Sequence, residues 1–108
     1  MRVFFHPEFP EEIRRYAAGY KQISPGLAVR FQQEIDAAVE AVKQSPTSAG
    51  HFLNLGSKIV PDLRRRNLRA FPFFILYGAT KEQLIFGSVI PSHSDPLTWL
   101  TRFQRPRP

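Results

Sequence analysis

Apolar side chains recur at a helical period over the first part of the chain. The first set is spaced by four, three, four and three residues, which predicts one face of a helix of about four turns: Phe9, Ile13, Tyr16, Tyr20 and Ile23. A second set continues at helical spacing: Leu27, Phe31, Ile35, Ala38 and Val42. Ser24-Pro25-Gly26 separates the two sets, with a good N-cap and a proline suited to the first turn. Because Pro46 interrupts the second set, we expect that helix to end near Gln44 and the two helices to form a hairpin.

The remaining elements are predicted strands. Residues 1–5 are apolar enough for a short buried strand, and 45–61 contain the breakers of a loop. Three further strands are expected, a basic one at 62–69, an aromatic and aliphatic one at 73–77 and a third at 84–90. The order is strand, helix, helix and three strands. It predicts a single α+β domain over residues 1–108, with an antiparallel four-stranded sheet and an N-terminal helical hairpin packed on one face.

Composition narrows the class of protein. The chain has 108 residues, a net charge of +6 and no cysteine, which excludes disulfides and cysteine nucleophiles. His6, His51 and His93 stand far apart in the sequence, so we expect no metal site and no cofactor. No apolar run approaches the ~18 residues of a membrane span, and the N-terminus is too short for a signal peptide. We therefore expect a cytoplasmic domain without a membrane partner.

The positive charge is uneven. Residues 1–60 carry seven basic and six acidic side chains, whereas residues 61–108 carry eight basic and three acidic ones. The basic residues are eleven arginines and four lysines, and arginine is suited to bidentate contacts with phosphate or carboxylate groups. A basic surface of this kind attracts nucleic acid or an acidic protein segment, although a solvated surface remains an alternative.

Five segments in order resemble the RelE/ParE superfamily of bacterial toxins, in particular its ParE-like branch. They include a Phe-Pro pair followed by Ile-x-Tyr, and together they are Phe5-His6-Pro7-Glu8, Ser24–Phe31, Ser45-Pro46, Arg66–Tyr77 and Asp95–Trp99. The resemblance implies the strand, helix and strand order predicted above. It also implies the toxin of a type II toxin–antitoxin system that inhibits growth, with DNA gyrase as one target, and a cognate antitoxin as partner. An acidic antitoxin segment would suit the basic half of the chain.

The alternative within the same superfamily is a RelE-type endoribonuclease that cuts messenger RNA on the ribosome without a metal. Its chemistry needs cations and an acid or base, for which Arg65, Arg69 and His93 are the candidate catalytic residues. Two departures weaken this alternative: Phe74 stands where RelE-type nucleases have arginine, and Pro91 stands where ParE-like members have histidine. A third alternative is a non-toxic relative that binds an acidic partner.

Binding residues are assigned in the same way. Arg64, Arg66 and Arg102 are candidates for contact with the target or with RNA. Tyr16, Tyr20 and Trp99 are candidates for contact with the antitoxin. The alternative for the two tyrosines is packing in the core, and the alternative for Trp99 is anchoring of the C-terminal tail on the domain. On a strand, residues 64 and 66 share one face and residues 65, 67 and 69 share the other, and the sequence leaves open which face meets the helices.

Overall fold

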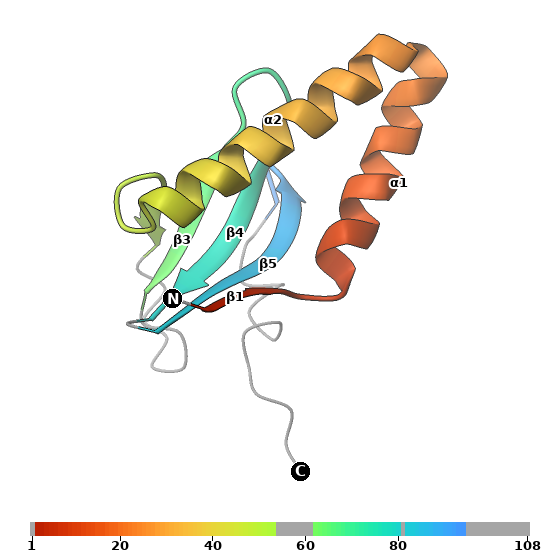
Figure 1. Cartoon of the computed structure of the whole chain (residues 1–108). Coiled ribbons are helices and arrows are strands. Elements are labelled where there is room, and N and C mark those ends of the chain that lie inside the picture. Colours follow the sequence, from red (N-terminus) through yellow and green to blue (C-terminus); the bar gives the residue numbers. More distant parts are fainter. Residues whose placement is uncertain (1, 54–61, 81, 95–108) are drawn as a thin grey trace.

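The computed structural model describes residues 2–53, 62–80 and 82–94. Its elements are β1 (Arg2–Phe5), α1 (Glu8–Ile23), α2 (Pro25–Gln44), β2 (His51–Leu53), β3 (Leu63–Asn67), β4 (Phe73–Ala79) and β5 (Gln83–Pro91). The strands form one sheet in the order β1-β5-β4-β3-β2, and the helical hairpin covers one face of it (Figure 1). The predicted α+β fold with a hairpin on one face of the sheet is confirmed.

The sheet itself differs from the prediction. It is mixed instead of antiparallel, because β1 runs parallel to β5, with Arg2 opposite Gln83 and Phe5 opposite Phe86. The other neighbouring pairs are antiparallel. A fifth strand, β2, lies in the segment predicted as loop and pairs with β3. Three residues are too few to show the alternation of a strand in the sequence. β2 is recognised only by its pairing with β3.

β1 is the edge strand beside β5, and its side chains are exposed. Val3, Phe4 and Phe5 are 37%, 45% and 43% exposed, so the prediction of a buried strand was wrong. Apolar composition indicated the strand, but it did not show that β1 has a neighbour on one side only.

The two helices begin and end where the apolar period predicts. Ser24 is the N-cap of α2 with an extended backbone, and Pro25 is its first residue. The Ser24 hydroxyl makes no capping hydrogen bond, while the Ser24 carbonyl accepts one from the Leu27 N–H at 3.1 Å. Ile23 ends the predicted apolar face of α1 but is 74% exposed, because the hairpin turn lies beyond the end of the sheet (Figure 1).

The core fills the space between the hairpin and the sheet. From α2 it receives Phe31, Ile35, Ala38 and Val42. All seven residues of β4 are buried, with alternate side chains facing the helices and the opposite side of the sheet. Burial of each large apolar side chain stabilises the fold by about 1.5–3 kcal/mol, so this central strand is the main anchor of the fold.

A buried carboxylate attaches α1 to β5. Glu12 is 3% exposed and accepts hydrogen bonds from the Ser88 hydroxyl at 2.9 Å and the Val89 N–H at 3.2 Å. β1 ends at Phe5, opposite Phe86, so the edge of β5 beyond that point no longer has a neighbouring strand. The Glu12 carboxylate therefore takes the place of a strand partner and fixes the start of α1.

Candidate functional site

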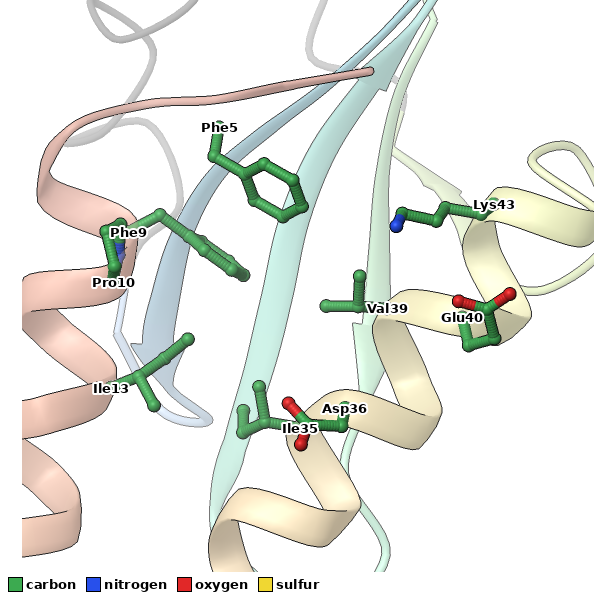
Figure 2. Close-up of a pocket in the computed structure, with 9 residues that line it drawn as sticks. All are labelled: Phe5, Phe9, Pro10, Ile13, Ile35, Asp36, Val39, Glu40 and Lys43. Carbon is green, nitrogen blue, oxygen red and sulfur yellow. The ribbon is translucent and has the colours of Figure 1, made fainter.

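A groove lies between the start of α1 and the second half of α2. The two helices diverge from their turn, which leaves an open space over the sheet between their far ends (Figure 1). The groove has a volume of about 470 Å³, and Figure 2 shows its lining: Phe5, Phe9, Pro10, Ile13, Ile35, Asp36, Val39, Glu40 and Lys43. The lining is largely apolar, and its charged side chains all come from α2.

Phe5 is the exposed aromatic surface of this groove. Its ring stacks on Phe86 at a centroid distance of 4.9 Å and an interplanar angle of 11°, and it lies 5.6 Å from the Phe9 ring. The Lys43 ammonium lies 5.9 Å from the Phe5 ring centroid, at the range limit of a cation–π contact. A side chain held by two aromatic neighbours loses little conformational entropy when a partner covers it, so the groove is preorganised for an apolar ligand.

The arginines of β3 divide between the two faces of the sheet. Arg64 donates to the Thr47 carbonyl and to the Asp62 carboxylate, both at 2.8 Å, and Arg66 donates to the Ala49 carbonyl at 2.7 Å. These bonds hold the turn that follows α2 against the sheet. Arg64 and Arg66 thus have a structural function that the sequence did not indicate, and their contact with a target or RNA stays a prediction.

Tyr77 supports the same turn from β4. Its hydroxyl donates to the Pro46 carbonyl at 3.0 Å. Burial raises the pKa of Tyr77, an effect that the nearby Arg64 guanidinium opposes and the Asp62 carboxylate reinforces. Tyr77 therefore stays protonated and keeps this donor through the neutral range.

Arg65 lies on the opposite face of β3. Residues 64 and 66 therefore face the turn that follows α2, and residue 65 faces away from it. Its guanidinium carbon is 3.8 Å from the Phe74 ring centroid, and it donates through Nε and Nη2 to the Asn67 side chain at 3.0 and 2.9 Å. Phe74 is fully buried under this cation. The aromatic ring therefore positions Arg65 and supplies no second charge there.

The three candidate catalytic residues do not form a connected group. Arg69 is exposed in the β3–β4 connection, where its backbone N–H donates to the Glu34 carboxylate. His93 is exposed in the turn after β5. Within residues 2–53, 62–80 and 82–94, no hydrogen bond or ion pair joins Arg65, Arg69 and His93.

The predicted antitoxin-binding tyrosines lie at the edge of the core. Tyr16 is 4.5 Å from the Phe73 ring, and Tyr20 is 5.0 Å from Phe71 and 5.3 Å from Phe31. Both are half-buried, and burial raises the pKa of Tyr20. Packing therefore accounts for most of each ring, and a role for the remaining exposed part stays a prediction. Trp99 and Arg102 lie outside the described residues.

Metal and membrane sites receive no support from the described part of the chain. Its histidine, aspartate and glutamate side chains form no group of three that would hold a metal ion. Neither helix described here is long and apolar enough to cross a bilayer.

The comparisons with known proteins agree with this fold. No protein-family model and no curated protein matches the sequence. A solved structure described as "Chromosomal ParDE TA system from P. aeruginosa" contains a similar chain, with a TM-score of 0.67 and 17% identity. The similarity covers 84% of this chain and 95% of that one. At this identity the likeness shows a common fold, which agrees with the α+β architecture predicted from the sequence.

Proposed function

We propose that this chain is the toxin of a type II toxin–antitoxin system, of the ParE-like branch, and that a cognate antitoxin neutralises it. The observation that carries the proposal is the fold shared with a chain of a ParDE toxin–antitoxin system over nearly the full length of both. The sequence motifs in Ser24–Phe31 and Arg66–Tyr77 support the same conclusion independently.

The groove is the proposed antitoxin site. Its apolar floor and the exposed Phe5 ring favour a segment that places apolar side chains between α1 and α2. Two carboxylates and one ammonium group form its charged part, from Asp36, Glu40 and Lys43. Apolar contact should therefore dominate inside the groove, and an acidic part of the antitoxin would bind elsewhere on the basic surface. A fall in affinity with rising salt would support that acidic contact.

Growth on induction tests the toxin itself. Expression in a bacterium should arrest growth, and coexpression of the cognate antitoxin should restore it. Purified DNA gyrase is the first target to assay, because the ParE-like resemblance implies it. Growth arrest with unaffected supercoiling would exclude gyrase as the target but would still support the assignment as a toxin. Unimpaired growth would instead support a non-toxic relative.

A groove substitution tests the antitoxin site. Val39→Asp places a carboxylate among the apolar lining residues of α2, and its desolvation should weaken antitoxin binding by about 2 kcal/mol, or roughly thirtyfold. Ala37→Asp is the matched control, since it adds the same charge to an exposed position of the same helix outside the groove. Equal losses for both variants in a titration with purified antitoxin would argue against the groove.

The RelE-type nuclease is the second candidate, and one observation supports it. The Arg65 guanidinium is held over Phe74 and remains half-exposed, which suits contact with a phosphate group. Primer extension on messenger RNA from induced cells would detect ribosome-dependent cuts. If Arg65→Ala and His93→Ala both left such cuts unchanged, the assigned catalytic residues would be wrong.

A further inference from the structure

The helical hairpin is electrically polarised along its length. Residues 14–33, here called the distal half, include the turn and carry four basic and no acidic side chains: Arg14, Arg15, Lys21 and Arg30. The rest of the hairpin has the opposite sign. Residues 8–12 carry three glutamates, and residues 34–44 carry three acidic residues and one lysine. Since α1 and α2 are antiparallel, both acidic segments lie at the groove end and the basic segment lies at the turn (Figure 1).

The distal half also exposes aliphatic side chains. Ile23 and Val29 flank the turn and are 74% and 56% exposed, more than any other large apolar residue among those described. One turn before Ile23, the Tyr20 ring packs against Phe31 and Phe71, which attaches this end of the hairpin to the core. Lys21 and Arg30, both exposed, lie within seven residues of the same turn in the sequence.

Within the hairpin, little of this charge is neutralised. Glu11 pairs with Arg14 on the exposed side of α1, and Arg15 lies 5.9 Å from the Tyr16 ring. Glu34, one turn after Arg30, instead accepts hydrogen bonds from the backbone N–H groups of Arg69 and Ala70. Lys21 and Arg30 are therefore available to an external anion.

We propose that the distal half is a second docking surface, separate from the groove, and that it binds an acidic protein surface that also presents apolar side chains. Charge complementarity selects an acidic partner. The exposed Ile23 and Val29 select a protein over a nucleic acid, because phosphate groups gain nothing from contact with aliphatic side chains, whereas a protein patch buries them. This surface would allow the protein to engage a second macromolecule while the groove is occupied.

A direct binding assay tests the surface without reference to toxicity. The probe is a fluorescent peptide of alternating glutamate and leucine, compared by anisotropy with a glutamate–glycine peptide of equal charge and with a single-stranded DNA oligonucleotide. The glutamate–leucine peptide should bind most tightly. Lys21→Gln and Arg30→Gln should each weaken it by about 1.4- to fivefold, the range for a solvent-exposed ion pair. Arg2→Gln is the matched control, because it removes one positive charge from the exposed strand β1.

Two further variants test the contribution of the exposed aliphatic side chains and the place where the peptide binds. Ile23→Ser should lower affinity for the glutamate–leucine peptide but leave the glutamate–glycine peptide unchanged. Val39→Asp alters the groove and should leave both unchanged. Circular dichroism melts of the Lys21, Ile23 and Arg30 variants should match the parent, since these side chains are exposed. Val39→Asp is compared at a temperature where its own melt shows it folded, because Val39 packs against the core.

Three results would overturn the proposal. The first is an equal loss for Arg2→Gln and for the hairpin variants, which would show attraction to net charge alone. The second is a loss with Val39→Asp but not with Lys21→Gln, which would place the peptide in the groove. The third is tighter binding of the oligonucleotide through the same residues. None of these results bears on growth arrest or antitoxin binding, so the toxin assignment succeeds or fails independently.

Discussion

Replacement of Glu12 by alanine should destabilise the fold far more than an ordinary surface substitution. The change removes a buried carboxylate and leaves the Ser88 hydroxyl and the Val89 N–H without this acceptor. A buried donor left unsatisfied costs about 1–3 kcal/mol. Some water will enter at the edge of β5, so we expect a loss of roughly 2–4 kcal/mol for the two donors together.

That loss is a large part of the stability expected for a small domain, about 5–15 kcal/mol. Each kcal/mol lowers Tm by about 4–8 °C in a domain of this size, so Glu12→Ala should melt roughly 8–32 °C below the parent. Urea unfolding followed by circular dichroism gives the free energy of unfolding directly.

Glu11→Ala is the matched control for this experiment. Glu11 precedes Glu12 on the same helix, but its ion pair with Arg14 is exposed, and such pairs contribute about 0–1 kcal/mol. Glu12→Gln should give an intermediate loss, because the amide keeps one acceptor oxygen. If Glu12→Ala cost no more than Glu11→Ala, the carboxylate would not be the anchor of α1, and the reasoning would be refuted.

Three further predictions concern the turn after α2 and the β3–β4 connection. Gly50→Ala would place a methyl group 2.9 Å from the Tyr77 Cζ atom, and this overpacking should lower the free energy of unfolding by about 1–3 kcal/mol in urea titrations, whereas an unchanged value would show that the turn can move away. Because burial raises the pKa of Tyr77, its hydroxyl stabilises the fold fully below its unfolded pKa of 10.0 and loses this effect as the pH rises through the higher folded value. Tyr77→Phe should therefore flatten the loss of stability above pH 10.0, and a melt series with the same alkaline slope in both proteins would contradict this. Glu34→Ala removes an exposed acceptor of the Ala70 N–H at 3.0 Å, where water can replace it, so thermal melts should reveal a loss of no more than about 1 kcal/mol, and a larger one would indicate a wider role.

The helices could be predicted closely because their stabilising pattern is local. Each helix has one apolar face repeated at its own period. Pro25 begins α2 and Pro46 follows its last residue. The failure at Ile23 has a physical reason. Periodicity shows which side chains share a face of the helix, but it does not show how far the sheet beneath that face extends.

The strands were harder because their partners are distant in sequence. The parallel pairing of β1 with β5 leaves no local signal, since parallel strands need a long connection between them. The face of β3 could not be predicted because apolar residues occupy both parities. Leu63 and Leu68 are both buried, one on each face, so the usual alternation of apolar and polar residues is lost.

The candidate functional site could likewise be predicted only in part, because its contacts join segments that are distant in the sequence. Arg64 and Arg66 were identified as candidates from charge, but both donate to backbone carbonyls, which have no sequence signature. The groove was missed because it arises from the divergence of two helices. Exposed aromatic residues at Phe4 and Phe5 were the available signal, and they were interpreted as part of a buried strand.

The pairing of β1 with β5 has a consequence for the order of folding. During synthesis the hairpin leaves the ribosome early, with its apolar face uncovered, and β1 has no neighbour until Gln83–Pro91 emerges. Contacts between such distant segments slow folding, because the chain must close a long loop before they form. Formation of β5 then completes the central sheet, binds the edge strand and supplies the partners of Glu12 in a single step. The last described strand therefore controls when the first one becomes structured, and unfolding of β5 should release β1 and the start of α1 as one cooperative unit.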